Sequence, residues 1–398
     1  MLVKRARHQT IGNKGAGHFV HLDMLRGVAA ILVLVNHARA YTFIPYSELE
    51  EVSIIWVPFY AFTSLGHQSV IVFFALSGFL VGGPMLQQIF QNTFSFKFYA
   101  FKRITRLWIV LLPALFLTMV LDQLGMMITN GYGYMGGIRE LYGLGPGGEN
   151  MRYAPLTLVA NLLFLQEILT SPFGSNGPLW SLSYEFWYYC AFPFIFLVVT
   201  FRSGKFFGIC SLAVCVALGF FLPFNILKLG TVWAAGALSF YFLQKRSTMF
   251  SDISSHYRAG AVIAIPFLMV ISQVLEAYGD ILLGISIAVL LPLIAHQSSS
   301  SRLYERLARR LSDISFSLYL AHSPVLVFLT ATLIFPDRII PGTEALAVFM
   351  SFCVTGLCAG FALWLLAERH TRDLQNALSI RLGLQSKPQS FPRDGKLP

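Results

Sequence analysis

The chain has 398 residues, of which 56% are hydrophobic and only 12% carry a charge. That composition excludes an ordinary soluble globular protein and is typical of a protein that crosses a membrane several times. The formal net charge is +10, but the basic residues lie between apolar segments, which indicates contact with membrane lipids and not with nucleic acid. The five cysteines lie in apolar runs and no His/Cys cluster has metal-ligand spacing, so we expect neither disulfides nor a metal site.

Apolar segments long enough to form membrane-spanning helices recur along almost the whole chain. We place ten of them, at residues 22–40, 68–86, 104–122, 178–201, 206–222, 226–243, 259–277, 279–296, 314–335 and 344–367. With the N-terminus inside, most of the 29 Lys and Arg residues fall on the inner side, so we predict that both termini are cytoplasmic. The sequence therefore predicts an all-α polytopic membrane bundle.

These segments divide the chain into three parts. Residues 1–21 form a cytoplasmic N-terminal segment, residues 22–368 one membrane domain, and residues 369–398 a cytoplasmic tail. We expect this tail to be disordered, because it is polar and contains prolines. No second copy of the first span appears, which argues against a carrier built from two related halves.

The first predicted span contains two ionisable residues, Arg26 and His37. A basic side chain at bilayer depth costs about 2.5–3.5 kcal/mol, so its presence indicates a function. The helical period brings the two side chains to nearly the same face, about 16 Å apart along the axis. A cleavable signal peptide is the alternative interpretation of this span, but Asp23 and Arg26 beside the apolar core count against it.

Between the third and fourth predicted spans lies a segment of unusual composition. Residues Gly125 to Arg152 hold nine glycines and three tyrosines, Tyr132, Tyr134 and Tyr142. Such a loop is either functional, with its tyrosines facing a sugar, or a flexible spacer. The apolar run from Leu156 to Leu165 would spoil the charge asymmetry of all later loops if it crossed the membrane, so we interpret it as interfacial or re-entrant.

A basic cluster lies at the inner end of the third span, where Lys102, Arg103 and Arg106 follow Lys97. Arg103 and Arg106 are three positions apart and share a helical face. Their guanidinium groups suit a polyanion, because they bind phosphates in a bidentate manner. The alternative is an ordinary cytoplasmic anchor that fixes the topology of the chain.

The fourth predicted span contains Glu185, about two turns inside its outer end. A carboxylate at this depth needs a cationic or hydrogen-bonding partner, and we expect that partner to be His37, which lies at a matching depth. The aromatic residues of the same span are typical of an interfacial belt. They are Trp180, Trp187, Tyr188 and Tyr189.

Small and polar residues in two further spans complete the candidate site. Gly78, which follows Ser77 in the second span, is expected to allow close helix packing. Ser77 could bond a ligand or the backbone of its own helix. His322 in the ninth span has two interpretations, a neutral histidine bonded to a backbone carbonyl or a member of the site.

Together these residues describe a group transfer across the membrane. A cytoplasmic polyphosphorylated donor would bind Arg103 and Arg106, and Arg26 would receive it within the membrane. His37 lies further toward the outer face, where it would take the proton of an acceptor hydroxyl as that hydroxyl attacks a thioester.

Five motifs carry a resemblance to a known family. They are Leu22-Asp-Met-Leu-Arg-Gly27 followed by His37, Phe74-Ala-Leu-Ser-Gly-Phe-Leu80, Arg103-Ile-Thr-Arg106, Pro178-Leu-Trp-Ser-Leu-Ser-Tyr-Glu185 and Ser317-Leu-Tyr-Leu-Ala-His322. With these motifs in this order, residues 23–368 resemble the acyltransferase family 3 membrane proteins, the O-acetyltransferases that modify bacterial surface glycans. The resemblance implies a ten-helix bundle that takes acyl-CoA, commonly acetyl-CoA, from the cytoplasm and has an acceptor outside.

The resemblance also implies a catalytic role for His37 together with Arg26, and donor binding by Arg103 and Arg106. We assign three roles in full: catalysis by His37, Arg26 and Glu185; donor binding by Arg103, Arg106, Lys102 and Ser77; and acceptor binding by Trp180, Ser181, Tyr319 and His322. No tightly bound cofactor is expected. The motifs leave open whether transfer is direct or passes through an acyl-enzyme.

The expected partners are acyl-CoA, membrane lipids and an extracytoplasmic glycan or lipid-linked oligosaccharide, and the expected location is the bacterial inner membrane. Some members of the family carry a further hydrolase-like domain after the bundle; without one, the bundle and its outer loops would select the acceptor. Exopolysaccharide, a lipopolysaccharide O-chain and a small secondary metabolite also fit as acceptors. The alternative function is a proton-coupled transporter or flippase that uses Arg26, Glu185 and His37 as a proton relay, and a third is a catalytically silent sensor.

Overall fold

The computed structural model describes residues 19–49, 54–131, 134, 153–200, 205–251, 253–295 and 301–384. Within these residues the chain is helical and contains no strand, only two isolated β-bridges. The helices are α1 (Val20–Thr42), α2 (Trp56–Thr63), α3 (Gly66–Ser77), α4 (Gly83–Phe90), α5 (Phe96–Ile128), α8 (Pro155–Leu162), α9 (Leu179–Thr200), α10 (Lys205–Phe221), α11 (Phe224–Lys245), α12 (Ser247–Ser251), α13 (Ser255–Val274), α14 (Glu276–Ala295), α15 (Arg302–Leu333), α16 (Thr343–Leu366) and α17 (Thr371–Arg381). Three short helical segments join them: η1 (Tyr46–Glu48), η2 (Gly78–Gly82) and η4 (Glu368–His370).

The prediction of an all-α polytopic membrane protein is confirmed. In the described parts of the chain, nine helical segments are long and apolar enough to cross a membrane, and Phe206–Phe221 in α10 is a shorter apolar helix. These segments correspond in order to the ten predicted spans. The chain is therefore a multi-pass membrane protein.

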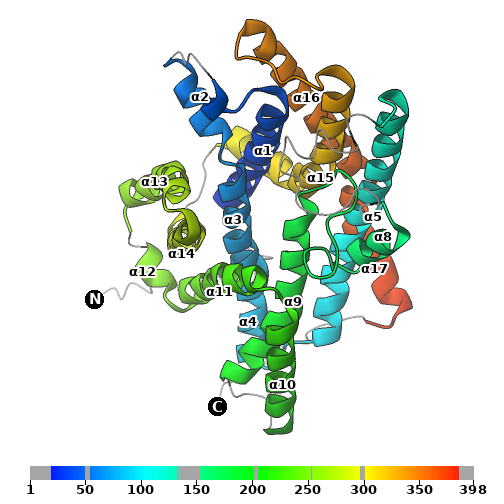
Figure 1. Ribbon diagram of the computed structural model, residues 1–398. Helices are drawn as coiled ribbons and strands as arrows, with labels where there is room; N and C mark the ends of the chain where they lie inside the picture. The colour runs from blue at the N-terminus through cyan, green and yellow to red at the C-terminus, as the bar shows by residue number, and fades with distance from the viewer. Residues whose placement is uncertain are drawn as a thin grey trace.

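The first span lies at the centre of the bundle. Helix α1 packs against α15, α3 and α16, and α15 also packs against α16 and α5. In Figure 1, α1 and α3 stand in the middle, with α11, α13 and α14 on one side and α5 and α17 on the other. Of the ionisable residues of α1, Arg26 lies among the neighbouring helices, and His37 contacts His322 of α15.

Helix α5 is longer than a bilayer requires. Its 33 residues extend about 50 Å, whereas the hydrocarbon core is about 30 Å thick. Ser95 caps its first turn by accepting a hydrogen bond from the Phe98 backbone N–H. The turns that carry Lys102 and Arg103 therefore have room to extend beyond the apolar part of the helix.

A π-helical segment, η2, interrupts the second span between α3 and α4 directly after Ser77. Segments of this kind are frequent at functional sites, because they change the direction of the side chains on either side. A Cβ atom at Gly78 would overlap the Trp233 backbone of α11, so this glycine lets η2 pack closely against α11. The prediction that Gly78 allows close helix packing is confirmed.

The apolar run predicted to be interfacial or re-entrant forms α8, whose eight residues are too few to cross a membrane. The chain then reverses direction through Phe164 and Glu167, which adopt φ angles of 58° and 67°. The Phe164 ring stacks on Phe186 of α9 with centroids 4.3 Å apart. Of the predicted sugar-facing tyrosines, Tyr132 and Tyr142 lie outside the described residues.

The prediction that residues 369–398 are disordered is wrong for the first part of this tail. Residues Thr371–Arg381 form helix α17, which lies against α5. Gln375 Nε2 donates to the Lys102 carbonyl and to Thr105 Oγ1, both at 3.0 Å. Sequence composition missed this helix because its stability comes from contact with α5 and not from an apolar run. Residues 1–18 and 385–398 lie outside the described residues.

Candidate active site

A pocket lies within the bundle where α1, α3, α5, α9 and α15 meet. Its empty volume, which includes space open to solvent, is about 730 Å³. Aromatic and aliphatic side chains form much of its wall. The polar residues that line it are Arg26, Ser77, Arg106, Ser181, Glu185, Tyr189, Ser315 and Tyr319.

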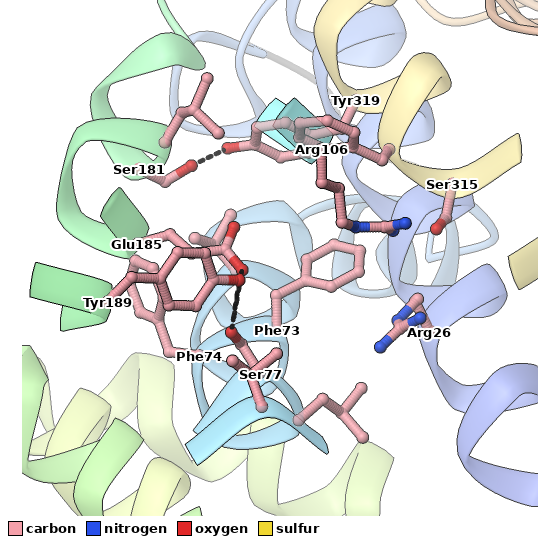
Figure 2. Close-up of a pocket in the computed structure, with 15 residues that line it drawn as sticks. Arg26, Phe73, Phe74, Ser77, Arg106, Ser181, Glu185, Tyr189, Ser315 and Tyr319 are labelled. Atoms are coloured by element: carbon pink, nitrogen blue, oxygen red, sulfur yellow. Dashed lines mark hydrogen bonds between the residues drawn. The ribbon is translucent and has the colours of Figure 1, made fainter. Parts of the chain in front are cut away.

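Hydroxyl groups hold Glu185 in this pocket. Ser77 Oγ donates to Glu185 Oε1 at 2.8 Å, and the Tyr189 hydroxyl donates to the same oxygen. Trp233 Nε1 donates to Ser77 Oγ at 3.2 Å and so fixes that hydroxyl from α11. Figure 2 shows Ser77, Tyr189 and Glu185 together on one side of the pocket, with the two arginines on the other. The carboxylate is thus oriented by side chains from three helices.

Arg26 on α1 and Arg106 on α5 bring two guanidinium groups to the pocket. Carboxylates balance both, since Arg26 lies within electrostatic range of Asp23 and Glu185, and Arg106 Nη2 lies 3.6 Å from Glu368 Oε1. The two arginines also lie within electrostatic range of each other. Two cations at this depth are stable only where carboxylates or a bound anion neutralise them, so the pocket is suited to an anionic group.

The remaining residues of the predicted donor cluster lie beside the pocket. The Arg103 guanidinium is 5.8 Å from the centre of the Tyr189 ring, and that of Arg106 is 5.8 Å from the Phe316 ring. Both rings line the pocket, so Arg103 lies beside the pocket, while Arg106 lines it directly. Lys102 instead packs on its own helix, with Nζ 4.3 Å from the centre of the Phe98 ring.

Three of the predicted acceptor residues lie near one another. Ser181 Oγ and the Tyr319 hydroxyl are 2.7 Å apart, so one donates to the other, and each oxygen lies 3.2 Å from the Pro178 carbonyl oxygen. Trp180, the next residue after Leu179, stacks on the His67 ring with centroids 6.2 Å apart. The start of α9 and the middle of α15 are thereby linked at one end of the pocket.

His37 on α1 and His322 on α15 form a second polar group, outside the residues that line the pocket. His37 Nδ1 lies 2.9 Å from His322 Nε2, and His322 Nδ1 lies 3.0 Å from the Leu318 carbonyl oxygen. His322 is fully buried. The Tyr319 ring lines the pocket and lies 5.8 Å from the His322 ring, so it connects the two groups.

Two predictions about this site are wrong. The partner of His37 is His322, whereas Glu185 bonds Ser77 and Tyr189. The expected pairing of His37 with Glu185 failed because matching depth does not specify which faces of two helices meet. The interfacial-belt interpretation also fails for Tyr189 and for its neighbour Tyr188, which are both buried. The Tyr188 hydroxyl donates to the Ile226 carbonyl at 3.0 Å, inside the bundle.

Sequence reasoning missed the role of Glu368. This carboxylate pairs with Arg106 and also accepts hydrogen bonds from the Ser317 backbone N–H at 3.1 Å and the Ser317 hydroxyl at 2.7 Å. The available signal was a carboxylate directly after the last apolar run, where it must be satisfied inside the protein.

Asp122 is a second residue that the sequence did not single out. Its carboxylate is fully buried in α5 and accepts hydrogen bonds from the Ser175 backbone N–H at 2.8 Å, the Ser175 hydroxyl at 2.6 Å and the Tyr153 hydroxyl at 3.2 Å. It thereby holds the segment that precedes α9. In the described part of the chain, no group of three or more His, Cys, Asp or Glu side chains is placed to bind a metal ion.

Comparison with known proteins identifies the family. A family model for an acyltransferase domain, that of the acyltransferase 3 family, matches residues 19–365. No curated protein and no solved structure matched the chain. The matched residues include α1 and α15, which carry the two histidines, and all the residues that line the pocket. Because the model covers nearly the whole chain, the protein belongs to the acyltransferase 3 family and is a membrane acyltransferase.

Proposed function

We propose that this acyltransferase moves an acetyl group from cytoplasmic acetyl-CoA to a hydroxyl of an extracytoplasmic glycan, in a bacterial inner membrane. The observation that carries the proposal is that α1 presents Arg26 to a pocket suited to an anion and His37 to a buried histidine. About 16 Å of helix separates the two residues, so an extended donor could contact both.

The donor would bind from the cytoplasmic side. Arg106 lines the pocket and Arg103 packs on the Tyr189 ring beside it, and each guanidinium can form bidentate hydrogen bonds to a phosphate group of CoA. Arg26 also lines the pocket, where it would neutralise a further negative charge or polarise the donor. Ser77 and Glu185 would then border the arm that carries the thioester.

The chemical step needs a base for the acceptor. In this proposal the acceptor hydroxyl gives its proton to His37 as its oxygen bonds to the thioester carbonyl carbon. The C–S bond then breaks, and the CoA thiolate takes a proton from the His37 imidazolium. The products are the acetyl ester and CoA–SH, and His37 returns to its neutral form. Trp180, Ser181 and Tyr319 would position the acceptor.

The test is acetyl transfer in membrane vesicles with labelled acetyl-CoA supplied only to the cytoplasmic face. Vesicles carrying the wild type, His37→Ala or His256→Ala are mixed with an envelope extract from the native host. His256 is exposed on α13, far from the site in sequence, and serves as the matched histidine control.

We expect the wild type and His256→Ala to label a glycan, and His37→Ala to lose labelling by at least about 100-fold, the usual contribution of a general base. Equal labelling by His37→Ala overturns the assignment of the base. Glycan movement coupled to proton flux without consumption of acetyl-CoA overturns the whole proposal in favour of a transporter.

A further inference from the structure

His322 lies in a place where only one assignment of protons satisfies its neighbours. It is fully buried, with Nδ1 3.0 Å from the Leu318 carbonyl oxygen and Nε2 2.9 Å from His37 Nδ1. A carbonyl oxygen can only accept a hydrogen bond, so His322 Nδ1 must carry a proton. In the neutral ring Nε2 is then an acceptor.

The position of the proton on His322 determines which nitrogen of His37 carries a proton. Because His322 Nε2 accepts, His37 Nδ1 must be the donor between the two rings. A neutral His37 with a proton on Nδ1 has only Nε2 left to accept a proton.

We propose that His322 is a positioning residue that holds His37 in the tautomer with Nε2 unprotonated, and that it does not bind the acceptor. This inference rests on the proposed function, since it assigns the basic atom of the proposed base. It replaces the acceptor-binding role predicted for His322 from the sequence.

The same hydrogen bond matters when the proton moves. As the acceptor oxygen bonds to the acyl carbon, its proton goes to His37 Nε2, and the ring becomes an imidazolium with N–H groups on both sides. The Nδ1–H bond to His322 then becomes charge-assisted and stronger, which stabilises the imidazolium. When the C–S bond breaks, the Nε2 proton passes to the thiolate, and both histidines return to their starting forms.

A neutral histidine suits this position better than a carboxylate would. A carboxylate beside His37 would add a buried negative charge that must itself be paired. The groups close to His37 are His322, the stacked Tyr41 ring and, within electrostatic range, Arg39. His322 can therefore orient the base without placing a fixed anion in the path of an acyl donor.

The variants that test this role are His322→Gln and His322→Leu. A Gln side chain can place its Oε1 atom near the present Nε2 atom and still accept from His37 Nδ1, whereas Leu of similar volume cannot. In protein labelled with ¹⁵N-histidine, we expect NMR to show His37 with Nδ1 protonated and Nε2 unprotonated in the wild type and in His322→Gln. We expect mixed tautomers in His322→Leu. His37→Ala assigns the His37 signals.

The activity readout separates positioning from acceptor binding. We expect His322→Leu to lower kcat at least about tenfold with little change in the KM values of donor and acceptor, and His322→Gln to recover most of that loss. A raised KM for the acceptor with a normal kcat would instead show that His322 binds the acceptor. If His37 keeps its tautomer in His322→Leu, His322 does not set that tautomer and the proposal is wrong.

The NMR result does not depend on the reaction. A wild-type protein that shows the expected tautomer but transfers no acyl group would overturn the proposed function and leave the assignment of protons intact. A His37 ring with its proton on Nε2 would overturn this inference even if transfer is normal.

Discussion

The Arg106 guanidinium lies 3.6 Å from the Glu368 carboxylate, so a predicted donor-binding arginine is already paired inside the protein. Glu368 is 8% exposed and is fixed by two hydrogen bonds from Ser317. A phosphate that binds Arg106 must therefore compete with a carboxylate that is held in place. The segment after α16 thus sets the strength of the cationic site at the pocket.

Weakening this competition should strengthen donor binding. We expect Glu368→Gln, which keeps an oxygen for Ser317 but removes the charge, to lower the KM for acetyl-CoA about fivefold, the effect of about 1 kcal/mol. The thermal stability in detergent should fall, because the Arg106 charge then lacks its partner. Transfer assays at varied acetyl-CoA concentration measure the first effect and melting curves the second.

The control for that substitution is Glu305→Gln. Glu305 pairs with Arg309 at 3.8 Å on the surface of α15, four positions along the same helix. We expect its KM and melting temperature to match those of the wild type. A Glu368→Gln protein with unchanged donor KM would show that phosphate does not use Arg106.

The three basic residues at the start of α5 should differ in importance. Arg106 lines the pocket and Arg103 packs on a ring that lines it, whereas Lys102 packs on Phe98 of its own helix. We expect Arg106→Ala and Arg103→Ala to raise the KM for acetyl-CoA at least about tenfold, since each loses a charge-assisted bidentate contact. Lys102→Ala should change it less than about twofold. Equal effects of the three substitutions would indicate a diffuse electrostatic site. High salt would then reduce the difference in KM between each variant and the wild type.

The fold was predictable from the sequence because spans depend on local properties. Each apolar run in water-excluding lipid must satisfy its own backbone hydrogen bonds, so length and hydropathy determine a helix. The sequence also predicted that the apolar run of α8 does not cross the membrane, because the charges of the later loops can be read directly from the sequence. Helix α17 could not be predicted in this way, since Gln375 is bonded to backbone and side-chain atoms of α5 far away in the sequence.

The site was predictable in its residues but not in its pairs. An ionisable residue in a span is visible in the sequence because burial of a charge is costly. The partner of that residue depends on the rotation of each helix about its axis, which packing decides. Arg26 was therefore expected inside the bundle, while the pairs of His37 with His322 and Arg106 with Glu368 appeared only in the structure.

Ser77 should act through Glu185. Its hydroxyl donates to Glu185 Oε1 and accepts from Trp233, so Ser77→Ala removes one bond to the carboxylate and leaves the Trp233 N–H without its partner. We expect kcat to fall about three- to tenfold, the effect of about 1 kcal/mol. Ser239→Ala is the control, because that hydroxyl donates to the Gly236 carbonyl of its own helix. A loss of more than about 1000-fold in Ser77→Ala would instead indicate a nucleophile and an acyl-enzyme.

Gly78→Ala should destabilise the bundle. A methyl group at this position would overlap the Trp233 backbone and force α3 and α11 apart, which costs about 1–3 kcal/mol. The melting temperature in detergent should fall, and activity should fall with it because Ser77 is the preceding residue. In the described part of the chain, a Cβ atom at Gly219 would meet nothing within 4 Å beyond its own helix, so Gly219→Ala should be neutral or slightly stabilising. Equal melting temperatures for the two variants would contradict this contact.

Asp122 should control the acceptor side of the site. In the segment before α9, the Ser175 backbone N–H and hydroxyl both donate to the Asp122 carboxylate. The preceding residue, Gly174, adopts a φ of 56°, a conformation that favours glycine. Asp122→Leu leaves the Ser175 N–H without its acceptor inside the protein, which costs about 1–3 kcal/mol.

Because this segment leads directly to Trp180 and Ser181, we expect Asp122→Leu to raise the KM for the acceptor more than that for acetyl-CoA. Asp122→Asn keeps one acceptor oxygen and should have a smaller effect on both stability and KM. Asp373→Leu, at an exposed position of α17, is the comparison for loss of charge alone. If Asp122→Leu raised only the donor KM, the segment would belong to the donor side, and the acceptor would have to enter elsewhere in the bundle.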